Sequence, residues 1–163
     1  MAVIQKKICM VGSFAVGKTS LVARFVKGIF SEKYLTTVGV KIDKRTVTVD
    51  DVQVNLMVWD LYGEDDFQKI KMSYLRGSSG YFLVVDGTRP ATLEKALQLN
   101  AKVREAIGPV PCLALFNKAD LKDQWAVDAR SATFDGPKRL TSAKTGQGVA
   151  EAFETLARMM VAP

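Results

Sequence analysis

The chain has 163 residues and a mass of 17.9 kDa, with 48% hydrophobic and 25% charged residues. We therefore expect one globular domain over residues 1–163 rather than a disordered or fibrous chain. The absence of histidine excludes imidazole acid–base catalysis and histidine-bound zinc. No apolar run is long enough to cross a bilayer. Because Cys9 and Cys112 lie in apolar runs of a chain with no export signal, we expect reduced cysteines and a cytoplasmic location.

Apolar runs typical of strands alternate with stretches of helical periodicity along the chain. In chain order, the first half predicts a strand over 3–11, an amphipathic helix over 18–27, an antiparallel hairpin of 40–49 and 52–60, and a short irregular helix over 64–75. The second half predicts a strand over 81–86, a helix over 90–107, a strand over 112–117, a short strand over 138–142, and a closing amphipathic helix over 148–160. This alternation predicts an α/β fold with a mostly parallel sheet covered on both faces, whose ligands bind at the carboxyl ends of the strands.

A phosphate-binding pattern follows the first predicted strand. The segment GSFAVGKTS matches G-x-x-x-x-G-K-[ST] and opens a predicted helix, so its backbone N–H groups are placed to bind anionic oxygens. Lys18 would contact the β- and γ-phosphates, and the Thr19 hydroxyl would bind Mg²⁺. The alternative is a chance turn rich in small residues. The predicted nucleotide-binding residues of this loop are Gly12, Ser13, Phe14, Ala15, Val16, Gly17, Lys18, Thr19 and Ser20.

A second motif, NKAD at 117–120, directly follows the buried strand segment that ends at Phe116, so it lies on the same edge of the sheet as the phosphate-binding loop. Asp120 could accept hydrogen bonds from guanine N1–H and the exocyclic amine, which adenine does not offer, so a buried carboxylate would be left unpaired against adenine. Lys118 can lay its aliphatic stem over the base, and Asn117 can brace the loops. The TSAK segment at 141–144 strengthens this assignment.

With these motifs in order, the chain resembles the small GTPases of the Ras superfamily, and the Rab branch most of all. The resemblance covers nearly the whole chain. It implies a P-loop NTPase small G domain with a mostly parallel six-stranded sheet, one antiparallel edge strand, and helices on both faces. It also implies a base pocket in which the Ala143 amide meets the guanine carbonyl, with contributions from Ser142 and Lys144.

Two further segments resemble the nucleotide-sensing switches of that family. YLTTVGV contains the threonine, Thr37, that would coordinate Mg²⁺ and sense the γ-phosphate. WDLYGEDD aligns with the family's WDTAGQ, so Asp60 would hold Mg²⁺ through water and the Gly63 amide would touch the γ-phosphate. The implied metal set is therefore Thr19, Thr37 and Asp60.

Several hydrophobic side chains match positions that the family uses for contacts. Phe30 falls where an aromatic packs against the base, and Tyr34 where a tyrosine covers the phosphates, although helix-end packing is an alternative for both. Ile42, Trp59 and Tyr74 match the partner-binding hydrophobic triad of the Rab branch. Burial of Ile42 and Trp59 in the hairpin is the alternative, whereas an exposed apolar patch would mark an interface.

The chain departs from the family pattern at functional positions. The catalytic glutamine is replaced by Glu64, and the small loop residue that faces the γ-phosphate is replaced by Phe14. The segment between NKAD and TSAK is short, so we expect the fourth helix to be reduced to about two turns around 123–132. These departures indicate a divergent member of the family, either prokaryotic or truncated. The expected catalytic set is Glu64, Lys18, Gly63 and Thr37.

Three functions fit these residues to different degrees. The first is a Mg²⁺-dependent switch that binds GTP and GDP, hydrolyses GTP slowly, and presents ordered switch loops to a protein partner. The second is a guanine-nucleotide-binding module without useful turnover, which Phe14 and Glu64 favour. The third, an ATP-dependent phosphotransferase, is disfavoured by Asp120.

The net charge of +6 bears on possible partners. The positive side chains are scattered, as in a solvated surface, but they could also attract an acidic partner or an anionic lipid surface. They include Lys6, Lys7, Lys41, Lys44, Arg45, Lys69, Lys71 and Arg76. We expect no nucleic-acid binding, because no such motif is present. We also expect no lipid anchor in this chain, a monomeric state, and regulation by an exchange factor and a GTPase-activating protein.

Overall fold

The computed structural model describes residues 2–13, 15–27, 39–62, 72–127, 134 and 136–162. Six strands form one sheet in the order β2-β3-β1-β4-β5-β6. The strands are β1 (Ala2–Gly12), β2 (Gly39–Val49), β3 (Val52–Tyr62), β4 (Gly80–Asp86), β5 (Cys112–Asn117) and β6 (Lys138–Leu140). The helices are α1 (Lys18–Lys27), α2 (Pro90–Ile107) and α3 (Val149–Val161), with single 3-10 turns η2 (Met72–Leu75) and η3 (Lys122–Gln124).

The predicted sheet topology is confirmed. The neighbours from β3 to β6 all pair in parallel, and β2 pairs antiparallel with β3 at the edge of the sheet. The hairpin turns at Asp50-Asp51, where Val49 faces Val52. Right-handed crossovers through helices are the ordinary way to join parallel strands, so the chain places helices on both faces.

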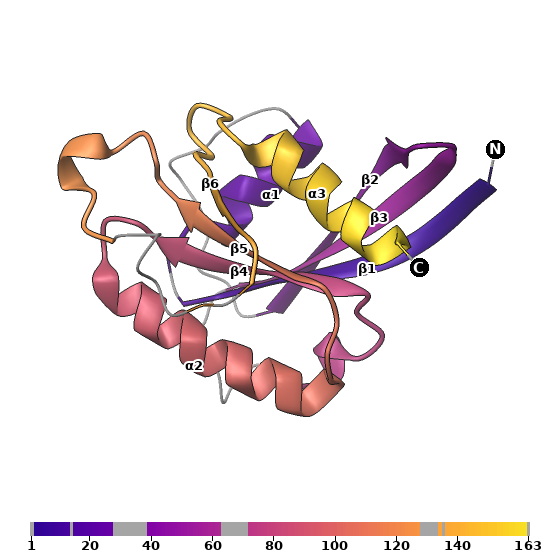
Figure 1. The fold of residues 1–163 in the computed structure, drawn as a ribbon, viewed down its shortest axis with the longest axis horizontal. Helices are drawn as coiled ribbons and strands as arrows, with labels where there is room; N and C mark the ends of the chain where they lie inside the picture. Colours follow the sequence, from indigo (N-terminus) through magenta and orange to yellow (C-terminus); the bar gives the residue numbers. More distant parts are fainter. Residues whose placement is uncertain are drawn as a thin grey trace.

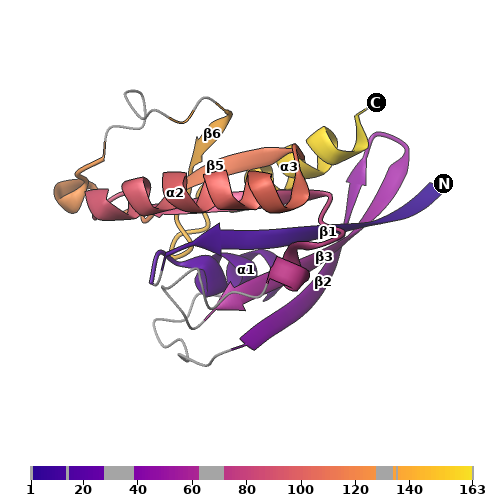
Figure 2. The ribbon, with the colours of Figure 1, turned by 90° about the horizontal axis from the view of Figure 1, so that it is seen from below.

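The helices α1 and α3 cover one face of the sheet, and α2 covers the other (Figures 1 and 2). On the first face, Phe153 of α3 stacks on Phe25 of α1 with ring centroids 3.8 Å apart and meets Phe82 of β4 edge-on at 4.7 Å. On the second face, α2 packs on buried side chains of the central strands, including Cys9, Tyr81 and Leu83. Every residue of β4 and β5 is buried, as expected for strands covered on both sides.

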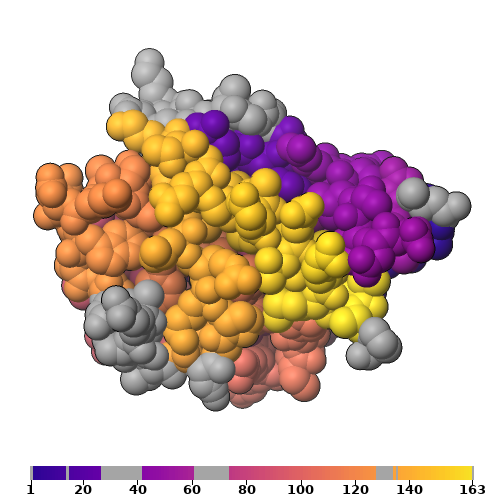
Figure 3. Space-filling view, turned by 45° about the horizontal axis from the view of Figure 1, so that its top comes forward, coloured from indigo at the N-terminus to yellow at the C-terminus, as the bar shows by residue number. Residues whose placement is uncertain are grey.

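The helix α3 also lies along the β2–β3 hairpin, where its side chains adjoin those of the hairpin in the space-filling view (Figure 3). At the turn of the hairpin, Arg158 of α3 forms an ion pair of 3.3 Å with Asp50. Both side chains are largely exposed, so this pair contributes at most about 1 kcal/mol to stability. The packing of apolar side chains beneath it therefore holds α3 in place.

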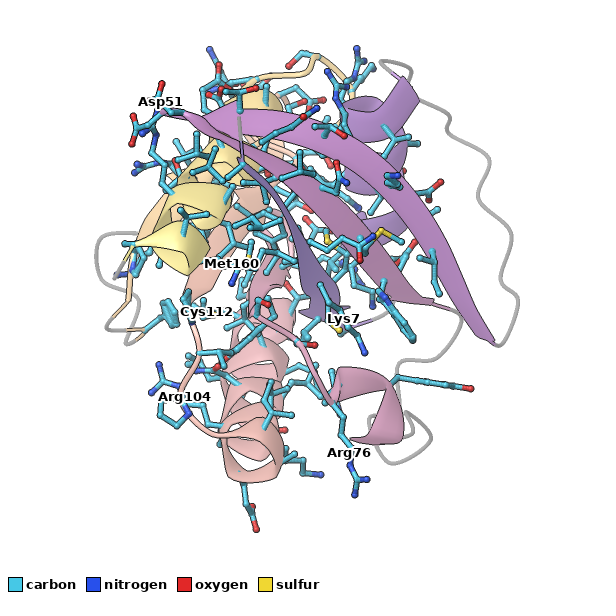
Figure 4. The ribbon with its side chains drawn as sticks, turned by 90° about the vertical axis from the view of Figure 1, so that its right-hand side faces the viewer. Lys7, Asp51, Arg76, Arg104, Cys112 and Met160 are labelled. Atoms are coloured by element: carbon cyan, nitrogen blue, oxygen red, sulfur yellow. The ribbon has the colours of Figure 1, made fainter. Side chains whose placement is uncertain are left out.

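Cys9 and Cys112 are free and buried, as predicted. Burial raises the pKa of the Cys112 thiol to about 11, so this thiol stays protonated and unreactive at neutral pH. Figure 4 labels Cys112 near Arg104, whose charge only partly opposes that shift. Among the described residues, no helix has the length and apolar character needed to cross a membrane.

The fourth helix is shortened, as predicted, but the expected two helical turns around 123–132 are not formed by the residues that the structure describes there. The backbone forms only the 3-10 turn η3 and is not helical at 125–127. The cause is tertiary hydrogen bonding, since the N–H groups of Ala126 and Val127 both donate to the Gly87 carbonyl, at 2.8 and 3.1 Å. Residues 128–133 lie outside the described part of the chain, as do residues 64–71 of the predicted helix over 64–75.

Candidate functional site

The loops that carry the sequence motifs meet at one edge of the sheet. Strands β1, β4, β5 and β6 run parallel, so the segments that follow their carboxyl ends lie beside one another. This edge therefore brings together the phosphate-binding loop after β1, the NKAD segment after β5 and the TSAK segment after β6.

The phosphate-binding loop has a backbone that favours glycine at one position. Gly17 has φ = +105°, and a Cβ built there would lie 2.2 Å from the Asn117 amide nitrogen. Asn117 uses that nitrogen to donate a hydrogen bond of 3.0 Å to the Val16 carbonyl. The Asn117 amide oxygen in turn accepts from the Thr141 hydroxyl at 3.1 Å. One buried side chain thus joins all three motifs.

Lys18 is nearly buried at the start of α1, with 6% of its surface exposed. Its ammonium donates to the Gly12 carbonyl at 2.6 Å and to the Ser13 carbonyl at 3.4 Å. Burial lowers the pKa of Lys18 to about 8, although the nearby Asp60 carboxylate opposes the shift. A desolvated cation held by the carbonyls of a loop rich in N–H donors is suited to bind a polyanion.

Thr19 and Asp60 form the second polar cluster of this edge. The Thr19 hydroxyl donates to Asp60 Oδ2 at 2.7 Å, and Asp60 is fully buried at the end of β3. A hydroxyl beside a carboxylate is a hard-oxygen donor set that fits Mg²⁺. Within the described residues, no three Cys, Asp or Glu side chains gather as a metal site, so any metal here would need further ligands from a bound molecule or from elsewhere in the chain.

Asp120 and Ser142 lie together in the predicted base pocket. The Ser142 hydroxyl donates to Asp120 Oδ1 at 2.7 Å and accepts from the Thr145 N–H at 3.1 Å. This contact orients the carboxylate of a partly buried aspartate. Ala143, next in the chain, is buried, whereas Lys144 is exposed.

Two residues beside the site, Arg24 and Asp86, lie outside the sequence motifs and were not among the predicted site residues. Arg24 of α1 donates from Nε to the Ala143 carbonyl at 2.9 Å and from Nη2 to the Lys144 carbonyl, which ties α1 to the TSAK segment. Asp86, at the end of β4, pairs with Lys118 at 2.9 Å. The available signal for Asp86 was a lone carboxylate that ends an otherwise apolar strand. Arg24 had no such signal, because a basic residue in an amphipathic helix is ordinarily solvated.

Ser20 lies in the first turn of α1 and is partly buried. Other predicted site residues lie outside the described part of the chain, and their contacts are not assigned. They are Phe14, Phe30, Tyr34, Thr37, Gly63 and Glu64.

The predicted hydrophobic triad gathers on the face of the sheet opposite α1 and α3. Ile42 is 48% exposed, and its cross-strand partner in the register is Trp59. The Trp59 and Tyr74 rings lie 6.3 Å apart between centroids, and both residues are partly buried. Ile42 is therefore not a buried residue of the hairpin, which was the alternative to partner binding. Trp59, in contrast, packs against the core beneath α2.

Lys7 covers one part of this triad. Its ammonium lies 3.7 Å from the centroid of the Trp59 ring and donates to the Arg76 carbonyl at 2.7 Å. Lys7 and Arg76 extend from the same side of the molecule (Figure 4). The Lys7 ammonium is therefore held in place on this surface by a cation–π contact with Trp59. At least this one positive side chain is more than a solvated surface charge.

The comparisons with known proteins agree with this geometry. The family model described as the Ras family matches residues 7–162. The chain is similar to the Ras-related protein Rab-13 of Canis lupus familiaris, Rattus norvegicus and Bos taurus. Each of these is 34% identical over 158 residues, a match that covers 93% of this chain and 78% of the relative. The chain therefore belongs to the Ras family and is a Rab-like small GTPase, a type of GTP-binding switch.

Proposed function

We propose that this chain binds GTP and GDP with Mg²⁺ at the edge formed by the phosphate-binding loop, NKAD and TSAK, and that it hydrolyses GTP slowly. The observation that carries the proposal is the pair of contacts from NKAD to the phosphate-binding loop. Asn117 donates to the Val16 carbonyl, and Lys118 donates to the Ala15 carbonyl at 3.1 Å. A loop for phosphates and a loop for a base are thereby held in one fixed arrangement.

The carboxylate of Asp120 supplies the base selectivity in this proposal. Ser142 orients one of its oxygens, and the carboxylate accepts from guanine N1–H and the 2-amino group. Adenine offers neither donor, so its binding would leave a partly buried carboxylate unpaired. The buried Ala143 amide is the proposed donor to the guanine carbonyl, and Arg24 holds the carbonyl of the same residue.

Thr19 and Asp60 are the described residues that would hold Mg²⁺, with Thr37 as the further ligand implied by the family resemblance. When bound, the ion neutralises charge on the β- and γ-phosphate oxygens. Lys18 contributes a second positive charge at the same place, because its ammonium is already held at the phosphate-binding loop by two carbonyls.

The rate of hydrolysis depends on two residues that depart from the family pattern. A glutamine can accept a hydrogen bond from the attacking water and donate one to the phosphoryl group, whereas an ionised Glu64 can only accept. Its negative charge is also repelled by the phosphate. Phe14 would occupy space near the γ-phosphate, unless its ring packs elsewhere. Both departures also fit the alternative function, a guanine-nucleotide-binding module without turnover. The rate of GTP hydrolysis distinguishes this module from a slow GTPase.

The partner surface in this proposal is the triad of Ile42, Trp59 and Tyr74. Exposed apolar side chains beside partly buried aromatics are typical of recognition sites. The ammonium of Lys7 over the Trp59 ring adds a positive charge at the rim of the patch. A protein partner that offers an apolar centre and an acidic rim fits this arrangement.

We expect Asp120→Asn to weaken GDP and GTP binding by roughly 2 kcal/mol or more, because a polar contact in the base pocket is lost. The same change should favour xanthine nucleotides, whose 2-oxo group suits an amide donor. Isothermal titration calorimetry with guanine, xanthine and adenine nucleotides measures both effects. Asp123→Asn, an exposed aspartate on η3, is the matched control and should leave affinity unchanged. Equal binding of ATP and GTP by the unmodified protein would contradict the proposal.

Thr19→Asn should reduce GTP affinity more than GDP affinity, by about 1.4 kcal/mol or more, which is tenfold. The reason is that the hydroxyl is the proposed Mg²⁺ ligand and the triphosphate depends more on that ion. Titrations with and without Mg²⁺ test this, with the exposed Thr48→Asn as control. If the Thr19 variant keeps the GTP affinity of the unmodified protein in the presence of Mg²⁺, the metal assignment is wrong.

Glu64→Gln alone should raise the rate of GTP hydrolysis modestly or not at all. Phe14→Gly together with Glu64→Gln should raise it by more than the two single changes combined, because the water-orienting amide needs the space that the ring would occupy. Single-turnover hydrolysis at saturating Mg²⁺ is measured for all four proteins. A rate for the unmodified protein that exceeds the rate for the double variant would mean that Glu64 works in a different catalytic arrangement.

Trp59→Ala and Ile42→Ala should each abolish capture of the GTP-dependent partner and leave nucleotide affinity intact. The truncation of such an anchor residue commonly costs about 2 kcal/mol or more. Affinity capture on protein loaded with a non-hydrolysable GTP analogue measures the loss. Val3→Ala, an exposed apolar side chain on β1, is the control. Because Ile42 is half exposed, its variant should fold normally. Retained capture by folded, nucleotide-bound variants would refute the assignment of this surface.

A further inference from the structure

Asp86 is a fully buried carboxylate that lies beside the site but belongs to none of the motifs. It ends β4, whose other residues are also buried. A charge in such a place is costly unless hydrogen bonds compensate it. The identity of its partners therefore indicates what this carboxylate does.

Three residues donate to the two carboxylate oxygens. Thr88 donates to Oδ1 from its backbone N–H at 2.8 Å and from its hydroxyl at 2.6 Å. Arg89 and Lys118 both donate to Oδ2 at 2.9 Å. Burial by itself would raise the pKa of Asp86, but the hydrogen bonds from Lys118, Thr88 and Arg89 lower it to about 2. The group is therefore a permanent anion at neutral pH.

Lys118 is the partner that connects Asp86 with the nucleotide site. Its ammonium also donates to the Ala15 carbonyl of the phosphate-binding loop at 3.1 Å, and a third of its side chain is exposed. The head group is thus hydrogen-bonded at two points, to the loop and to the carboxylate, although the side chain is partly exposed. A stem fixed in this way can lie flat against a bound ring without losing further rotamer freedom.

The backbone around Asp86 is joined to the NKAD segment as well. The Gly87 N–H donates to the Asn117 carbonyl at 3.0 Å. The Gly87 carbonyl accepts from Ala126 and Val127 on the far side of NKAD. The Trp125 ring packs so closely on Gly87 that an added Cβ would come within 2.0 Å of it. The loop after β4 is therefore bonded both to the first residue of NKAD and to the segment at 126–127 that follows the motif in the chain.

We propose that Asp86 is a positioning residue for the nucleotide: its carboxylate holds the Lys118 ammonium against the phosphate-binding loop and thereby prolongs the lifetime of bound GDP and GTP. The inference rests on the proposed function, because it assigns Lys118 to the base. It differs from a merely structural role, in which Asp86 would only order the start of α2 through Thr88 and Arg89. The two roles predict different coupling to Lys118.

The test is a double-mutant cycle between Asp86 and Lys118. Asp86→Asn, Lys118→Met, the double variant and the unmodified protein are loaded with a fluorescent N-methylanthraniloyl derivative of GDP. Its dissociation is followed after addition of excess unlabelled GDP in the presence of Mg²⁺. The matched control is Asp50→Asn, which makes the same chemical change at an exposed ion pair with Arg158.

We expect Asp86→Asn to speed GDP release about tenfold or more, the size typical of a lost charge-assisted hydrogen bond. Lys118→Met should have a similar effect, and the double variant should release GDP no faster than the faster of the two single variants. Asp50→Asn should release GDP at the rate of the unmodified protein. The inference is overturned if Asp86→Asn leaves release unchanged, or if it speeds release equally in the Lys118→Met background.

Asp86→Glu is the second variant, for the case in which Asp86→Asn does not fold. It keeps the charge but displaces the carboxylate by one methylene, so it should speed release severalfold in the unmodified background and have no effect beside Lys118→Met. Unchanged release in Asp86→Glu would also overturn the inference. Failure of the unmodified protein to bind the fluorescent GDP would instead refute the proposed function itself, and the role of Asp86 with it.

Discussion

The hydrogen bond from the Asn117 side chain to the Val16 carbonyl is the contact on which the site depends. It fixes the distance between the phosphate-binding loop after β1 and the NKAD segment after β5, although these segments are about a hundred residues apart in the chain. The same contact excludes a side chain at position 17, where a Cβ would collide with the Asn117 nitrogen. Thr141 completes the arrangement from the third loop. A change in any of these residues therefore affects all three motifs together.

The charges of the site are arranged around this contact in opposite pairs. Lys18 is a desolvated cation near Asp60, and Lys118 is a cation bound to the buried Asp86. Each lysine also donates to carbonyl oxygens of the phosphate-binding loop. Because charges in a low-dielectric region interact strongly, these contacts hold both lysines in fixed positions at this edge of the sheet. In the proposed function, the same fixed charges would recognise the nucleotide.

The sequence was sufficient for the elements and contacts that local patterns determine. The amphipathic period of KTSLVARFVK predicted the bounds of α1 without error, and the apolar runs that flank Asp50-Asp51 predicted the antiparallel hairpin. Contacts set by tertiary packing were missed. Arg24 was unassigned because its acceptors are backbone carbonyls on a distant loop. The helix predicted around 123–132 does not continue through Ala126 and Val127 because their N–H groups bond to the Gly87 carbonyl rather than to the preceding turn.

In the proposed function, this edge of the sheet holds a guanine nucleotide. The most direct measurement is to denature the purified protein and identify the released nucleotide by chromatography against nucleotide standards. Our account predicts GDP or GTP in an amount close to one molecule per chain, since a preorganised and partly buried site retains its ligand through purification. Release of an adenine nucleotide in that amount would contradict the account. So would a protein that releases nothing and, after incubation with GDP and Mg²⁺, still retains none.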